Sequence, residues 1–497
     1  MPPDARSAAR EVRELRGEIR HWRRSRANAS LGQAISDAYI GVLAFVMLGS
    51  MLVNTLIGVA GLSEEHCTSQ GCRDARGLLP WVVAGATLVV LWALARTFGP
   101  VYAAPSVAYW LMETPLDRGV LLRGRLRLLV AAFALAAAAV AAGAALLAGF
   151  GAGSTVAFAL LVAGAAASGI ALAVLGQSST RNPVLVLAGL ALAGTWGSLL
   201  ALTLHRAPEL ERPQSAPAWW WLLGGVLTAL AVVAGLAARR LTRRLRRRDI
   251  VRGGTLVPGL GGALANLDLA LTYDVLLAYR WRSRGSARSR RGGPSGAAAL
   301  IWTDLIRIAR SPVWLVLLAA AVVVPYAAQT AGAERVVVIV VAGCGFLAGL
   351  PFLSALRVLT RTAGVARQFP TSLGATRGAA LAVPAILLGC FGLACVPAVH
   401  RAVDVPWSTA LLLALAAAAG GLASGVRWVT GRPPDYGRPL ITSPAGAVPT
   451  NLYGSALRGF DILLLTTAPM LLAPSDGGAA GSLVISAIVL AYLANRK

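Results

Sequence analysis

The stretches LLVAAFALAAAAVAAGAALLAG (residues 128–149) and GSTVAFALLVAGAAASGIALAVL (residues 153–175) decide the fold class. Neither contains a charged residue, and each is long enough to form a helix across the bilayer, which takes roughly 20 apolar residues. The chain of 497 residues is 57% hydrophobic and only 13% charged, too little charge for a soluble surface. The sequence therefore predicts an all-α, polytopic integral membrane protein.

Similar stretches along the chain predict about 12 transmembrane helices in two six-helix halves. The Ala- and Gly-rich character of many of them favours close helix packing. The predicted spans lie near residues 38–60, 78–95, 128–149, 153–175, 183–204, 218–238, 313–333, 336–354, 378–399, 407–425, 459–473 and 482–494.

The distribution of charge predicts that both termini are cytoplasmic. With the N-terminus inside, the outer loops hold only six of the 46 basic residues, as the positive-inside rule requires. The net charge of +25 then belongs to the inner face, where it favours anionic membrane lipids and no nucleic-acid partner. The six outer basic residues are Arg73, Arg76, Arg206, Arg212, Arg335 and Arg401.

Four regions follow from this pattern. Residues 1–35 form a charged, amphipathic cytoplasmic region, whose first 30 residues hold eight arginines and no short basic start followed by an apolar run, so we expect no cleaved signal peptide. Residues 36–238 form the first six-span half. Residues 239–299 form a basic cytoplasmic linker with an interfacial helix near 266–281, and residues 300–497 form the second half.

The predicted outer side carries two local features. Cys67 and Cys72 share the first outer loop, and an oxidising exterior would let them form a disulfide. A metal site with His66 is the alternative, but no second ligand cluster accompanies these residues, so we predict none. Trp219–Trp221 begin the sixth span and predict an interfacial anchor.

Each half begins with an amphipathic lead-in segment before its first span. The first contains Trp22 and Arg23, and the second is LIWTDLIRIARSP at 300–312, which includes Trp302. Helical spacing predicts that Leu300, Ile301, Leu305 and Ile308 form an apolar face, whereas Asp304, Arg307 and Arg310 remain in water. Both segments are expected to lie at the inner membrane surface as interfacial helices.

A long inner loop follows the second span in each half. Pro115 and Pro370, like Gly119 and Gly374, are separated by the same 255 residues, which suggests a duplicated unit. A proline-started helix in a loop of mixed charge, with Glu113, Asp117, Arg118 and Arg123, suits the docking of a partner. An ordinary positive-inside loop with helix-capping residues is the alternative.

With these loops and lead-in helices, the chain resembles the membrane subunits (permeases) of ABC-2-type ABC transporters, here as a fused tandem pair. The resemblance implies a permease of an ATP-driven exporter in the plasma membrane. It also implies a separate ATP-binding subunit, in two copies, that carries ATP and Mg²⁺, whereas this chain would hold no cofactor. The loops after the second spans would be the coupling elements, with docking residues Glu113, Pro115, Asp117, Arg118, Phe369, Pro370, Thr371, Ser372 and Arg377.

No feature of the sequence predicts catalysis. The single lysine is Lys497, so no internal lysine can serve an ATP-binding loop of the GxxxxGK[ST] type. The four histidines are far apart, which argues against a membrane enzyme. The spans hold few ionisable groups, which favours a lipid-like, peptide or other amphiphilic cargo over ion coupling.

Two alternatives remain open at this point. The first is an ion-coupled carrier of major-facilitator-like architecture, and the second is a non-transporting membrane partner or scaffold. The near-complete use of arginine instead of lysine is typical of a GC-rich, actinobacterial genome.

Overall fold

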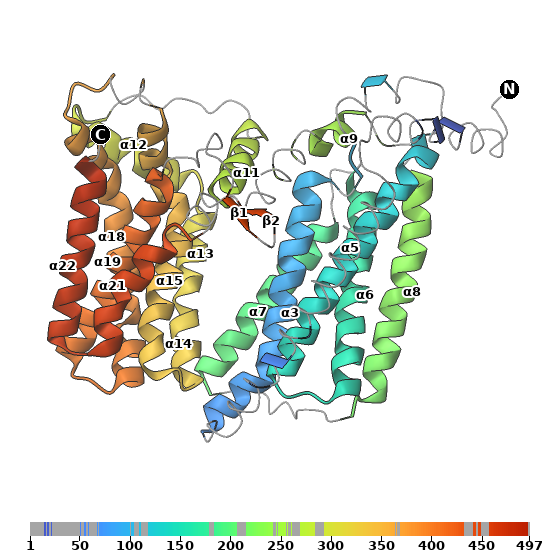
Figure 1. Ribbon diagram of the computed structural model, residues 1–497, viewed down its shortest axis with the longest axis horizontal. Helices are drawn as coiled ribbons and strands as arrows, with labels where there is room; N and C mark the ends of the chain where they lie inside the picture. The colour runs from blue at the N-terminus through green and yellow to red at the C-terminus, as the bar shows by residue number, and fades with distance from the viewer. Residues whose placement is uncertain are drawn as a thin grey trace. The chain divides into compact units, whose positions relative to one another are not determined.

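The structure is a computed structural model of the chain (Figure 1). It describes residues 67–99 apart from 68, and residues 101–103, 118–177, 183–205, 215–241, 247–254, 269–283, 293–362, 368–431, 441–443, 446–448 and 457–495, with isolated positions elsewhere.

The described chain is almost entirely helical, and ten of its helical segments are long and apolar enough to cross a membrane. A helix satisfies all its internal backbone hydrogen bonds without water, so it is the form in which such segments can span a bilayer. The protein is therefore a multi-pass membrane protein. Of the twelve predicted spans, the one at residues 38–60 is described only at isolated positions, and residues 459–473 correspond to a helix of only 13 residues.

Five of the spanning helices precede residue 242, and the others follow residue 312. The first five are α3 (Gln70–Phe98), α5 (Arg118–Leu147), α6 (Ala152–Gln177), α7 (Pro183–Thr203) and α8 (Ala218–Leu241). The later elements are α13 (Val313–Ala321), α14 (Val323–Thr330), η2 (Glu334–Val336), α15 (Val337–Gly349), η3 (Leu350–Leu353), α16 (Ser354–Arg361), α18 (Leu373–Val403), α19 (Trp407–Thr430), α21 (Phe460–Leu472) and α22 (Asp476–Asn495).

Shorter elements connect or precede the spans. The helices are α9 (Arg247–Gly254), α11 (Leu269–Ser283) and α12 (Ala297–Ala309). Two three-residue strands, β1 (Ile441–Ser443) and β2 (Gly446–Val448), pair antiparallel with Ile441 opposite Val448. This small hairpin is the one described departure from the all-α prediction.

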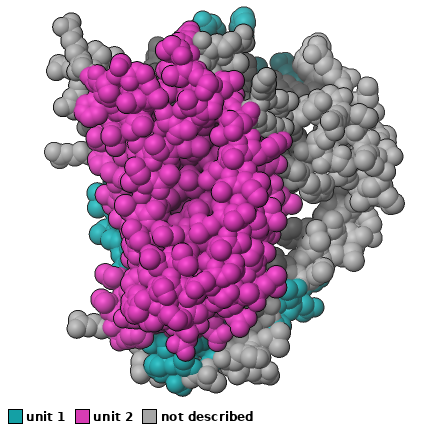
Figure 2. All heavy atoms as spheres, turned by 90° about the vertical axis from the view of Figure 1, so that its left-hand side faces the viewer, with its two compact units in different colours: residues 1–198, 207–258 teal, residues 199–206, 259–497 magenta. Residues whose placement is uncertain are grey.

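The chain divides into two compact units. The first comprises residues 1–198 and 207–258, and the second comprises residues 199–206 and 259–497. Figure 2 draws them in separate colours, and the second unit presents a broad, continuous face in that view.

In the first unit, α6 is the central helix and packs against α3, α5 and α8. Most of its apolar segment is buried, 61%, compared with 28% or less for the other spans that precede residue 242. Small residues permit this close approach: a Cβ atom added at Gly164 would lie 3.1 Å from the Cβ of Leu227 in α8.

The second unit is built in the same way around α19, of which 78% of the apolar segment is buried. This helix packs against α15, α18, α21 and α22. Both α6 and α19 occupy the fourth position among the spans that the sequence predicts for their halves. The same position is thus central in both units, which is what a duplicated six-span unit would produce.

An aromatic cluster in the first unit contains one of the three consecutive tryptophans. The expectation that all three form an interfacial anchor is therefore corrected. Trp220 is only 4% exposed, and its ring centroid lies 5.8 Å from that of Trp81 and 5.6 Å from that of Phe158. Trp219 and Trp221 are about half exposed, as an interfacial anchor would be. Consecutive helical residues point about 100° apart, so the three side chains cannot all face the lipid interface.

Candidate functional site

The lead-in helix α12 is fixed to the second unit by both apolar and charged contacts. Ile308 is buried in the hydrophobic core of the unit, and Ile301 packs against that core. Arg307 donates a hydrogen bond from Nη2 to the carbonyl oxygen of Phe352 in η3, at 2.8 Å. The same nitrogen lies 2.6 Å from Oδ1 of Asp304. The helix is therefore attached to the segment Glu334–Arg361, which is long and apolar enough to span a membrane, and it also packs against α18.

The buried face of α12 differs from the expected one. Asp304, expected in water, is only 3% exposed, whereas Leu305, expected on the apolar face, is 46% exposed. Ile301, Asp304 and Ile308 follow the i, i+3, i+7 spacing of a single helix face, so the carboxylate is buried with the two isoleucines. Its pairing with Arg307 offsets part of the cost. Trp302 lies on the outer side, with 37% of its surface exposed.

Burial changes the acidity of this ion pair. It raises the pKa of Asp304 to about 6 from its usual 3.8, because the loss of water disfavours the carboxylate more than Arg307 stabilises it. The pKa of Arg307 is lowered from its usual value, again mainly by burial, with Asp304 acting in the opposite direction. The docking of α12 should therefore depend on pH.

We expect α12 to be less stably docked at pH 7.5 than at pH 5. Asp304 keeps its proton up to a pH of about 6 in the folded state but loses it near pH 3.8 in the unfolded state. The stability that the protonated carboxyl contributes is therefore lost as the pH rises through this range. The loss between pH 5 and pH 7.5 is about 1 kcal/mol. Hydrogen exchange of the amides in residues 297–309 measures it, and Asp304→Asn should remove the slope. An equal slope in the variant and the wild type would contradict this assignment.

The second predicted coupling loop forms a turn that leads directly into α18. Ser372 is the N-cap residue, and its Oγ accepts a hydrogen bond from the backbone N–H of Ala375 at 3.3 Å. Pro370 and Ser372 are exposed. Phe369 is half-buried and packs against the hydrophobic core of the unit. One side of the turn is thus held by the hydrophobic core of the unit, while the other side is exposed on the surface of the unit.

Two further residues of the predicted docking set make contacts within the chain. The hydroxyls of Thr371 and the buried Thr376 lie 2.7 Å apart, which links the turn to the first turn of α18. Arg377 donates from Nη1 to the carbonyl oxygens of Ala494, at 3.0 Å, and Leu493, at 3.5 Å. These belong to the last turn of α22, so Arg377 satisfies carbonyl groups that a helix end leaves without an intrahelical partner.

An ion-pair cluster that was not predicted from the sequence joins the linker helix α11 to α16. Asp274 of α11 forms ion pairs with Arg357 and with Arg361, the latter at 3.0 Å. Arg357 is only 3% exposed, and its guanidinium carbon lies 5.1 Å from the centroid of the Tyr273 ring. The two arginines are spaced i, i+4 at the end of a span, so they lie on one face of the helix. This spacing is the sequence signal from which a shared acidic partner could have been predicted.

Several predicted site residues lie outside the described residues. Of the docking residues predicted in the first coupling loop, only Arg118 is described, as the first residue of α5, so the two loops cannot be compared side chain by side chain. The residues outside the described ranges are Glu113, Pro115, Asp117, Trp22 and Arg23.

Cys67 and Cys72 are joined by a disulfide at the start of α3. The backbone N–H of Cys72 also donates to the side chain of Ser69, the N-cap residue of this helix, at 3.2 Å. Two local constraints thus define where the span begins. Among the described residues, no group of three or more His, Cys, Asp or Glu side chains is arranged to hold a metal ion.

The end of the second unit at which α18 begins therefore gathers an attached lead-in helix, a capped turn with an exposed side, and a charged cluster. No curated protein matches the sequence. A family model does match, over residues 72–439, which is most of the chain and includes α12, α16 and the turn before α18. The chain belongs to this family, which is a family of unknown function (DUF6297).

Proposed function

We propose that this chain is the permease subunit of an ATP-driven ABC-2-type exporter in the plasma membrane. A separate ATP-binding subunit, present in two copies, supplies ATP and Mg²⁺ and docks on the cytoplasmic loops. The transported cargo is an amphiphile such as a lipid or peptide. The charge pattern of the loops supports placing this docking side in the cytoplasm.

The observation that carries the proposal is the attachment of α12. Arg307 bonds to the Phe352 carbonyl in the second span of its unit, and α12 packs against α18, which starts at the candidate coupling turn. A force applied to the turn would therefore reach the lead-in helix and two membrane spans together. Such a rigid connection between a surface element and several spans is what a subunit driven from outside the membrane needs.

The exposed side of the turn gives a direct test. Ser372→Asp keeps an N-cap residue and places a negative charge at the positive end of the helix, so the fold should tolerate it. We expect co-purification of the ATP-binding subunit to fall at least about tenfold, because the new carboxylate would be desolvated at the docking surface. The chain itself should keep its thermal stability.

Ser69→Asp is the matched control. Ser69 is also an exposed N-cap residue, but it begins α3 on the side that the charge pattern assigns to the exterior. This variant should retain the ATP-binding subunit at the wild-type level. Retention by Ser372→Asp as well, in a folded protein, would remove the coupling role of the turn.

A non-transporting scaffold is the second candidate, and the packing of the second unit favours it. Thr466 of α21 and Ser424 of α19 are both fully buried, and each hydroxyl bonds to a carbonyl oxygen of its own helix. Because these hydroxyls already donate hydrogen bonds, they require no contact with a cargo molecule or with water. A scaffold would bind a partner complex through these units without nucleotide-dependent transport of its own.

A further inference from the structure

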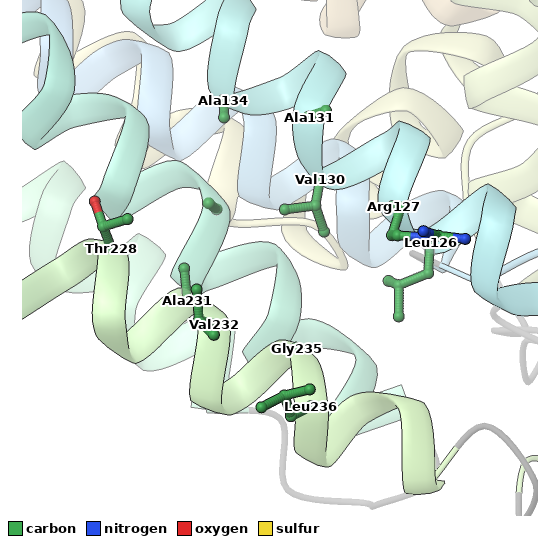
Figure 3. A pocket seen from close by; sticks show the side chains of 11 residues that line it. Leu126, Arg127, Val130, Ala131, Ala134, Thr228, Ala231, Val232, Gly235 and Leu236 are labelled. Atoms are coloured by element: carbon green, nitrogen blue, oxygen red, sulfur yellow. The ribbon is translucent and has the colours of Figure 1, made fainter.

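A groove of about 330 Å³ lies on the first unit between α5, α6 and α8 (Figure 3). Its lining is apolar except for Arg127 and Thr228. The hydroxyl of Thr228 donates a hydrogen bond to the carbonyl oxygen of Gly224 in its own helix, at 2.8 Å, so its donor needs no polar ligand. The groove is thus an apolar surface depression along two membrane spans, with one charged side chain in its lining.

That charged group stands at one end of the groove. Figure 3 shows Arg127 at one end and Thr228 towards the other. Thr228 and Gly235 are seven residues apart on α8, which corresponds to about 10 Å along the helix axis. Arg127 is close to the start of its span, on the side that the positive-inside pattern assigns to the cytoplasm. The groove therefore runs from the inner surface towards the middle of the bilayer.

The guanidinium of Arg127 is available to a ligand. Its neighbour Arg125 donates to the Tyr102 carbonyl oxygen at 3.1 Å, whereas Arg127 is exposed and has no hydrogen-bond or ion-pair partner among the described residues. Arg240 is exposed one helical turn beyond Leu236, which lines the groove, and adds a second positive charge near the same end. Basic pockets between spans on the cytoplasmic side suit anionic lipid head groups.

From this arrangement we infer that the groove binds an anionic phospholipid of the inner leaflet. One acyl chain lies between α5 and α8, and the lipid phosphate bonds to Arg127. Arg–phosphate hydrogen bonds are charge-assisted and two-pronged, which fixes the head group while the apolar walls hold the chain. The site belongs to this chain alone, so it stands whether or not an ATP-binding subunit drives the protein.

Two substitutions separate the roles of the two ends. Arg127→Gln removes the charge and leaves a shorter, uncharged polar side chain. Gly235→Leu fills the groove, and it should fold because a Cβ atom at Gly235 meets nothing within 4 Å. Arg96→Gln, at an exposed arginine of α3 that does not line the groove, is the control for charge. Gly225→Leu, at an equally open glycine of α8 outside the lining, is the control for bulk.

Native mass spectrometry of the full chain, titrated with phosphatidylglycerol or with phosphatidylcholine of the same acyl chains, measures the binding. We expect Arg127→Gln to weaken phosphatidylglycerol binding about fivefold and to change phosphatidylcholine binding less than twofold. Gly235→Leu should weaken the binding of both lipids, and both control variants should behave as the wild type.

Two results would overturn the inference. One is phosphatidylglycerol binding that neither Arg127→Gln nor Gly235→Leu reduces. The other is an efficient disulfide between a cysteine introduced at Ala131, which lines the groove, and one introduced in residues 38–60, because the chain itself would then be the occupant. Loss of lipid binding in these variants with an unchanged ATP-binding partner would support the lipid site independently of the proposed export function.

Discussion

Replacement of Gly421 by leucine should prevent the second unit from assembling. A Cβ atom at this position would stand 2.6 Å from the carbonyl oxygen of Ala342 and 3.0 Å from the backbone nitrogen of Phe346, both in α15. Backbone atoms cannot rotate away, so the two helices would have to separate. Overpacking of this kind costs at least about 3 kcal/mol, and the loss of the α15–α19 contact adds to it.

The measurement is the yield of monodisperse protein and the midpoint of its thermal unfolding. Gly343→Leu is the matched control, because it lies on α15 and a Cβ atom there meets nothing within 4 Å. This control should be as stable as the wild type or slightly more, since leucine is the better helix former. Equal stability of the two variants would show that α19 does not pack on α15 through Gly421.

The second large effect is expected from Asp274→Asn. This change removes the carboxylate that pairs with Arg357 and Arg361 while keeping the side-chain volume. Because Arg357 is only 3% exposed, its charge would remain in a low-dielectric site without the acid that compensates it. Because the Asp274 side chain is itself 28% exposed, water offsets part of this effect, and the cost is about 2 kcal/mol, less than for a fully buried pair. We expect this loss in the free energy of unfolding, together with faster hydrogen exchange in α11.

Arg427→Gln is the control for the Asp274 variant. Arg427 and Asp461 form an ion pair at 3.4 Å, but their side chains are 30% and 43% exposed. Such a pair contributes less than about 1 kcal/mol, because water stabilises each charge alone. An effect of Asp274→Asn no greater than that of Arg427→Gln would mean that α11 is not held to α16 by the buried pair.

The sequence predicted where helices cross the membrane more reliably than which way their faces point. The length of the apolar stretches alone locates α5, α6 and α19. A single segment inside a bilayer can satisfy its backbone hydrogen bonds only by forming a helix. It does not reveal that α6 and α19 are central, because helices rich in Ala and Gly are apolar on every side. Their burial depends on close contacts such as that between Gly421 and α15, which only the folded structure specifies.

The charged residues around α11, α12 and α18 illustrate the same limit. Asp304 was expected in water because carboxylates are seldom buried, yet Arg307 at i+3 allows it to face the core. Asp274 was not singled out, because its partners lie more than 80 residues further along the chain. For the candidate coupling turn, the sequence located the exposed Pro370 and Ser372, but it did not predict that Arg377 caps the end of α22.

The stoichiometry of the complex purified from native membranes in mild detergent tests the proposed function most directly. We expect two copies of an ATP-binding protein for each full-length chain, held in a complex that Ser372→Asp releases and Ser69→Asp does not. A folded chain that is isolated from those membranes without a nucleotide-binding protein, and that moves amphiphiles across liposomes on an ion gradient alone, would contradict it.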